Sequence, residues 1–132
     1  MAFHSFALQE ALYTRLDDDS TLGALITGVY DSVPDDTTLP IVVIGEGTTI
    51  DNGTKTLDAR DYVFTVDVWS SYRGFKQSKN IMKQVYSLLH EYSLGVSGAN
   101  LIDCRCEFTT QVIEGDGVTR HGIMRFRAFI TD

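Results

Sequence analysis

An alternation of apolar and polar side chains, followed at once by a helical repeat, constrains the fold of this chain more than any other feature. The alternating stretch Asp61–Trp69 reads DYVFTVDVW. Its core-facing positions are Tyr62, Phe64, Val66 and Val68. From about Tyr72 to Tyr92 the apolar residues recur at three- and four-residue spacing, which is typical of an amphipathic helix. Ser70 or Ser71 is expected to cap this helix.

The rest of the chain supplies a second long helix and more strands. A helical repeat covers about Ser5 to Leu16, and Ser20 can cap a short turn after it. The β-branched run IVVI predicts a buried strand, and two later alternations, at 101–109 and 118–130, predict a hairpin. Hairpins without regular helical crossovers favour a single α+β domain, residues 1–132: a mostly antiparallel sheet with two long helices packed on one face.

Two segments allow more detailed predictions. Residues Gly45–Ala59 are polar, rich in Gly and Thr, and without a strong period, so we expect a mobile loop or a loose hairpin. The alternation at 101–109 predicts four inward-facing residues: Ile102, Cys104, Cys106 and Phe108. The alternation in the last segment predicts another inward face: Arg120, Gly122, Met124, Phe126, Ala128 and Ile130.

The charge and composition exclude several classes of protein. The formal net charge is -7, which disfavours attraction to a phosphate backbone, because that attraction comes from clustered Lys and Arg. No apolar run approaches the roughly 18 residues of a membrane span, and the N-terminal residues lack a signal-peptide pattern. We therefore expect a cytoplasmic chain with no membrane association.

No motif predicts catalysis, a metal or a cofactor. Cys104 and Cys106 are expected to be reduced core thiols, because residues two apart on a strand are poorly placed to bridge each other. GEGTTI lacks the third glycine of a dinucleotide fingerprint, and GVSGA lacks the spacing of a nucleophile elbow. His90 is expected to interact with the end of its helix, and His121 has no assigned acid or nucleophile.

Arg125 and Arg127 lie two residues apart on the exposed face of the last strand, and Arg105 lies on the strand before it. This arginine stripe has three interpretations. The arginines can pair across the hairpin with Glu107, Asp103 or Glu114, because opposite charges pair between strands. They can form a subunit interface, where arginine is enriched. They can also bind an anion or a nucleic acid, which the overall charge disfavours.

A second candidate surface lies where the central strand meets the helix, in VWSSYRGF. Trp69, Tyr72 and Phe75 can be core aromatics beneath the start of the helix. A tryptophan near Arg73 at an element boundary is also typical of a protein–protein contact. The residues alone do not separate these interpretations.

Three segments together carry a family resemblance: YDSVPDD before a proline-led strand, VWSSYRGFK leading into the helix, and RHGIMRFRA near the end. The chain resembles the tail-completion or tail-terminator proteins of long-tailed bacteriophages, prophages and gene transfer agents. The resemblance implies a structural α+β protein that forms a six-membered ring at the head-proximal end of the virion tail, after synthesis in the host cytoplasm. Such a ring ends tail-tube polymerisation and joins the tail to the head connector.

The implied partners are other copies of the chain, the tail-tube protein and the head-connector stopper protein, with DNA passing through the lumen without specific binding. In a ring each subunit uses two different surfaces, so the arginine stripe is expected to meet acids of a neighbour. The candidate acids are Asp35, Asp36 and Asp58. Two other functions stay open: a head–tail adaptor or stopper, and a small-molecule-binding module with a pocket near Trp69, Tyr72 and His121.

Overall fold

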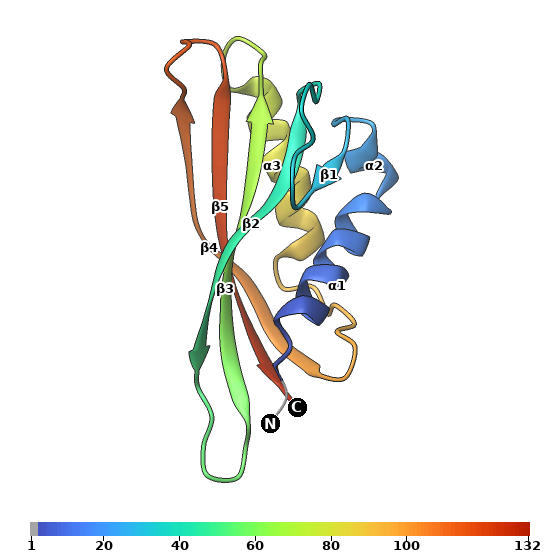
Figure 1. Ribbon diagram of the computed structural model, residues 1–132, viewed down its shortest axis with the longest axis vertical. Coiled ribbons are helices and arrows are strands. Elements are labelled where there is room, and N and C mark those ends of the chain that lie inside the picture. The colour runs from blue at the N-terminus through green and yellow to red at the C-terminus, as the bar shows by residue number, and fades with distance from the viewer. Residues whose placement is uncertain (1–2) are drawn as a thin grey trace.

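The computed structural model describes residues 3–132 as one five-stranded sheet with helices on one face (Figure 1). The helices are α1 (Ser5–Asp17), α2 (Ser20–Gly23) and α3 (Lys76–Leu89). The strands are β1 (Val29–Tyr30), β2 (Ile41–Asp51), β3 (Ala59–Ser70), β4 (Asn100–Ile113) and β5 (Arg120–Thr131). The strand order is β1-β2-β3-β5-β4, and every pairing is antiparallel except that of the short β1 with β2. The predicted α+β class is confirmed.

The alternating segment forms the central strand β3. It pairs along its length with β5, and β2 pairs with it on the other side, so both of its edges are used. Its predicted inner face is buried: Tyr62, Phe64, Val66 and Val68 are all at most 5% exposed. The inner face of β5 matches the prediction as well, and Phe126 stacks on Phe64 with ring centroids 5.4 Å apart.

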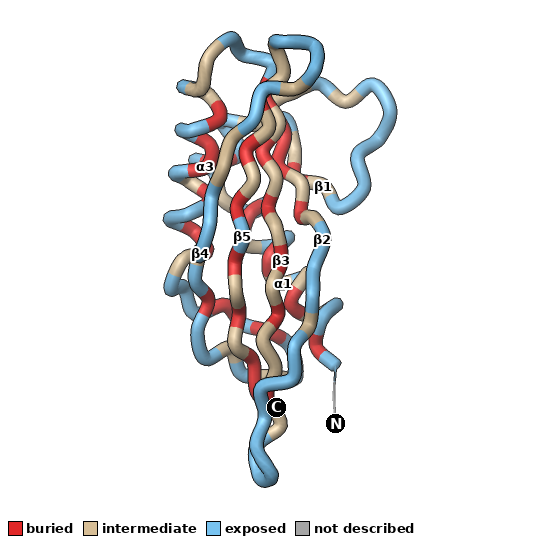
Figure 2. The backbone as a smooth tube through the Cα atoms, turned by 90° about the vertical axis from the view of Figure 1, so that its left-hand side faces the viewer, coloured by how far each residue is buried: buried red, intermediate tan, exposed pale blue. Residues whose placement is uncertain are grey.

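Helices α1 and α3 cover the inner face of the sheet (Figure 1). Helix α1 buries one row of leucines: Leu8, Leu12 and Leu16. Helix α3 buries a broader stripe: Ser78, Ile81, Met82, Val85, Leu88 and Leu89. These residues and the inner faces of β2, β3 and β5 form the hydrophobic core, while the other face of the sheet carries no helix (Figure 2).

The predicted start and caps of the helices need correction. Helix α3 begins at Lys76 and not near Tyr72, because Gly74 has a φ of 95°, which interrupts a right-handed helix. Ser70 is no cap: its hydroxyl donates to the Gln77 side chain and accepts from the Tyr72 N–H, and Phe75 is the N-cap residue. Helix α2 is capped by the Asp19 carboxylate, which accepts from the Leu22 N–H, and not by Ser20.

The polar segment 45–59 is a hairpin, one of the two forms expected for it. Strand β2 continues to Asp51, and one extra residue on β2 near Gly45 shifts its register against β3. The loop 52–58 is closed by hydrogen bonds from the Asn52 N–H to the Ala59 carbonyl and from the Thr54 N–H to the Leu57 carbonyl. This β2–β3 hairpin projects beyond the helices at one end of the molecule (Figure 1).

The predicted inward face of β4 is wrong at both ends. Cys104 is buried and Cys106 packs against the core, but Ile102 and Phe108 are 60% and 46% exposed. The register of β4 against β5 shifts between Leu101 and Asp103 and again between Cys106 and Phe108. Each extra residue reverses the side to which the following side chains point, so a strict alternation fails here.

Candidate interaction surfaces

The open face of the sheet carries the arginine stripe, Trp69 and His121 among the residues that sequence analysis singled out. Figure 2 views this face directly, with the helices behind it. Strands β3 and β5 bring alternate side chains to it, and β4 lies along one edge. The surface is therefore built by residues from distant parts of the chain.

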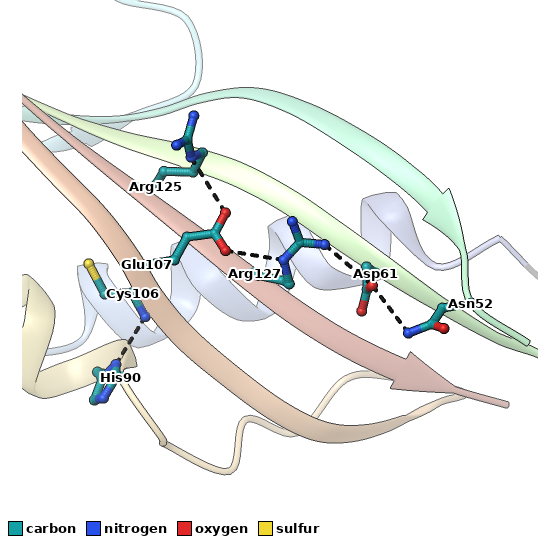
Figure 3. A network of polar contacts seen from close by, with 7 residues as sticks. All are labelled: Asn52, Asp61, His90, Cys106, Glu107, Arg125 and Arg127. Atoms are coloured by element: carbon teal, nitrogen blue, oxygen red, sulfur yellow. Dashed lines mark hydrogen bonds and ion pairs between the residues drawn. The ribbon is translucent and has the colours of Figure 1, made fainter.

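Two members of the arginine stripe (Arg105, Arg125 and Arg127) are part of an ion-pair network, namely Arg125 and Arg127 (Figure 3). One carboxylate, that of Glu107, lies 3.4 Å from Arg125 Nε and 3.1 Å from Arg127 Nε. Arg127 Nη1 lies 3.3 Å from Asp61 Oδ2, which also accepts a hydrogen bond of 3.2 Å from Asn52 Nδ2. The hydrogen bond and charge of Glu107, together with Asp61, raise the pKa of Arg127 above its usual value.

This network confirms the predicted cross-strand pairing with Glu107. The other two predicted partners, Asp103 and Glu114, are wrong. Within residues 3–132 no ion pair joins Asp103 to the stripe, and Glu114 contacts His121 instead. Arg105 pairs at 2.6 Å with Glu91, which follows helix α3 and lies outside the hairpin. Each arginine of the stripe thus has an acidic partner within the chain, so the stripe is not an unneutralised basic surface.

Sequence analysis missed Asp61 and Asn52 as members of this network and Glu91 as the separate partner of Arg105. Asp61 lies on the outer face of β3, opposite Phe129, two residue pairs away from the Val63–Arg127 pair. Its meeting with Arg127 depends on the pairing of β3 with β5, two strands that are far apart in the sequence. No local pattern specifies that register.

The aromatic corner separates into two places. Trp69 stacks on His121 on the open face, with ring centroids 3.7 Å apart and an interplanar angle of 13°. Tyr72 is 50% exposed and lines a shallow hollow between α2 and α3 together with Leu25 and Lys76. Arg73 is exposed in the connecting turn. The structure therefore does not bring Trp69, Tyr72 and His121 into one pocket.

The His121 ring is held by two carboxylates. Its Nε2 lies 2.9 Å from Asp67 Oδ1, and its Nδ1 lies 3.2 Å from Glu114 Oε1. Both ring nitrogens are therefore engaged within the chain, and the ring face is covered by Trp69. A general base needs a nitrogen free to accept a substrate proton, so this arrangement is typical of a structural contact.

The three candidate acids do not form one surface. Asp35 and Asp36 lie in the loop between β1 and β2, and Asp36 has a φ of 60°. Asp58 immediately precedes β3, and its carbonyl accepts from the Asp132 N–H at 3.3 Å. Because β2 and β3 are antiparallel, their first residues lie at opposite ends of the sheet.

His90 connects the end of α3 to the edge strand β4. Its Nδ1 accepts a hydrogen bond of 2.9 Å from the Cys106 backbone N–H (Figure 3), and its ring stacks on Tyr86 at 4.4 Å. The expected side-chain interaction with the last carbonyls of the helix is replaced by this contact with β4. His90 is thus an edge contact and not a free base.

Both cysteines are free thiols, as predicted. Burial raises the pKa of Cys104 from 9.0 to about 12, and burial also raises the pKa of Cys106. The pKa of Cys104 is higher in the folded chain than in the unfolded chain. The stability that the protonated thiol contributes is therefore complete below about pH 9 and is lost as the pH rises toward 12.

We expect a maleimide to modify Cys104 at pH 8 only after unfolding, because the attacking group is the exposed thiolate. Half-buried Cys106 is the internal control and should react faster in the folded chain. Peptide mapping by mass spectrometry with and without denaturant measures both rates. Equal rates for the two thiols in the folded chain would contradict this assignment.

Over residues 3–132 no group of three or more His, Cys, Asp or Glu side chains is arranged to hold a metal ion. None of the helices in that part of the chain has the length and apolar character needed to span a membrane.

Comparisons with known proteins agree with one another. The family model described as "Tail completion protein gp17" matches residues 10–131. The tail completion protein gp17 of Bacillus phage SPP1 is 26% identical over 128 residues, which are 97% of this chain and 95% of that protein. The solved structure of SPP1 gp17 matches with a TM-score of 0.67 at 27% identity, over 97% of this chain and 90% of that one. A chain in the virion of a native gene transfer agent particle matches with a TM-score of 0.91 at 26% identity, over the full length of both.

Proposed function

Because the chain belongs to the tail completion protein gp17 family, we propose that it forms a ring at the head-proximal end of a phage-like tail, where it ends tail-tube polymerisation and joins the tail to the head connector. It is a structural virion protein of the tail-completion type and not an enzyme. Its partners in this role are other copies of itself, the tail-tube protein and the head-connector stopper protein.

The observation that carries the proposal is the match to the gene transfer agent virion. A TM-score of 0.91 over 100% of both chains shows that the two folds agree along the whole compared length. The engagement of His121 on both nitrogens supports the same conclusion, because it removes the best candidate for an active-site base. No specific observation favours the small-molecule-binding module.

We propose that the ring contains six copies. Cyclic assemblies use two different surfaces of each subunit, and a net charge of -7 makes neighbouring copies repel one another in general. Although each arginine of the stripe has an acidic partner within its own chain, we propose that the stripe also lies beside an acidic surface of the neighbour. The candidates for that surface are Asp35 and Asp36 together, or Asp58 at the other end of the sheet. Trp69, Tyr72 and Arg73 are proposed contacts with a neighbour or the tail. A lumen with like charge would let DNA pass without binding its phosphates.

The β2–β3 hairpin is the proposed contact with the tail tube or the connector. It projects from the body of the molecule, and its loop 52–58 is exposed except for Asp58, which is half-buried (Figure 1). Projecting loops on a rigid sheet commonly carry binding contacts.

Deletion of the gene, followed by electron microscopy of the released particles, tests the proposal. We expect overlong tail tubes that are not joined to filled heads, and restoration of normal particles by an intact copy of the gene. Tubes of normal length beside detached heads would indicate an adaptor or stopper instead. Normal joined particles after deletion would overturn the structural role.

A complementing copy of the gene with Arg127→Glu tests the arginine stripe separately. Unchanged ring assembly in that variant would count against the stripe as a subunit contact.

A further inference from the structure

The edge strand β4 is blocked along only part of its length. The Glu91 N–H donates to the Cys104 carbonyl at 2.6 Å, and the Cys106 N–H donates to His90 Nδ1 at 2.9 Å (Figure 3). Within residues 3–132 no comparable contact reaches the backbone N–H groups of Phe108–Ile113 on the side away from β5. The first part of β4 is therefore closed to pairing, and its last part is open.

The opposite edge of the sheet shows the same division. Strand β1 pairs with Val42 and Val43 of β2, and the Val42 N–H donates to the Gly28 carbonyl. Beyond the bulge, Gly47–Asp51 pairs only with β3 among the described strands. Figure 2 shows both open segments as mostly exposed, one along β4 and one along the far half of β2.

Both open segments have the composition of strands that pair. Residues Phe108–Ile113 read FTTQVI, with no charge, proline or glycine, and Gly47–Asp51 reads GTTID. Phe108, Val112 and Ile113 are 46%, 42% and 51% exposed, and Ile50 is 45% exposed. Natural sheets usually protect open edges with charges, proline or bulges. A bulge precedes each segment, but within the two segments the pairing is regular and Asp51 is the single charged residue, so these partly apolar edges indicate that a partner covers them.

We propose that these two segments pair with each other between neighbouring copies: Phe108–Ile113 of one subunit adds to Gly47–Asp51 of the next. The inference rests on the proposed ring, and it names the contact that builds it. Strand β2 is antiparallel to β3, β3 to β5, and β5 to β4. A second copy in the same orientation therefore presents its β2 antiparallel to β4, and the sheet continues across the boundary.

The charge of the chain favours a second copy as the occupant. Copies with a net charge of -7 associate most readily where neither surface is charged, and the two open segments together contain one ionisable side chain, Asp51. The two segments lie on opposite edges of one sheet, so the contact is heterologous and can close a ring.

The strand register adds a geometric consequence. Along the strand direction, the open segment of β4, Phe108–Ile113, lies at the level of Thr65–Ser70 of β3. The open segment of β2, Gly47–Asp51, lies at the level of Arg60–Phe64 of β3. Successive subunits are therefore offset along the strands by about six residues, or about 20 Å at ~3.3 Å per residue. A closed ring accommodates this offset only if the strands are inclined to its axis, as in a barrel.

Disulfide trapping in assembled particles tests the pairing. Thr110 shares the open face with Ile123, and Thr48 shares it with Val63, so these two side chains lie on one face of the joined sheet, directly opposite or diagonal to each other, if the segments pair. We expect the double variant Thr110→Cys with Thr48→Cys to form, on oxidation, a ladder of multiples of 14.7 kDa. The matched control is Thr110→Cys with Thr49→Cys, because Thr49 points to the opposite face, and wild type controls for the native thiols.

Particles of normal shape in which the double variant stays monomeric would overturn the pairing and leave the proposed function intact. Normal joined particles after gene deletion would overturn the proposed function itself. Amide hydrogen exchange on wild-type chain, isolated and in particles, needs no substitution. Greater protection on assembly of both Phe108–Ile113 and Gly47–Asp51 supports the pairing, and unchanged exchange in either segment contradicts it.

Discussion

Replacing Phe126 by alanine is expected to destabilise the chain by about 3–5 kcal/mol, the usual range for truncating a buried aromatic residue. Phe126 is 0% exposed, lies on the inner face of β5, and stacks on Phe64 of β3. Because it packs at the centre of the sheet, the surrounding strands cannot collapse into the space that its ring leaves. Urea denaturation followed by circular dichroism measures the loss.

The matched control for this substitution is Phe129→Ala on the same strand. Phe129 lies on the open face and is half-buried, so it should lose less stability than Phe126. A similar loss for the two variants would mean that the open face is packed as tightly as the core, which would contradict the one-sided core described above.

The second large effect is expected at helix α1. Leu12→Ala should lower the free energy of unfolding by about 2–5 kcal/mol, because Leu12 is 1% exposed and holds the helix against the sheet. Tyr13, the next residue, is 40% exposed, and Tyr13→Ala should change stability by less than about 1 kcal/mol. Thermal unfolding of both variants measures the two losses. A loss for Leu12→Ala as small as that for Tyr13→Ala would mean that helix α1 contributes little to stability.

The features that followed from the sequence are those set by local periodicity. The alternation in Asp61–Trp69 identifies β3 and its inner face, because the side-chain period of a strand is two. The leucine row of α1 identifies a helix for the equivalent reason. The core and the helix-covered sheet are therefore predictable from spacing alone.

The features that did not follow depend on pairing between distant segments. The bulges in β4 turn Ile102 and Phe108 outward, and nothing in their neighbours' identities marks the extra residues. The contact between Arg127 and Asp61 requires the register of β3 against β5. The open edges are visible only once the strand order is known, since the same residues would be covered in a different order.

The strand order also determines when this sheet can form during synthesis. Strand β5 is the last to be made, yet it lies between β3 and β4 and pairs with both along their length. Until β5 leaves the ribosome, β4 has no neighbouring strand and β3 has one bare edge. Native pairing of these strands is consequently a late event, dominated by contacts distant in sequence, and this topology favours slow folding in which the uncharged strand segments are exposed to other nascent chains.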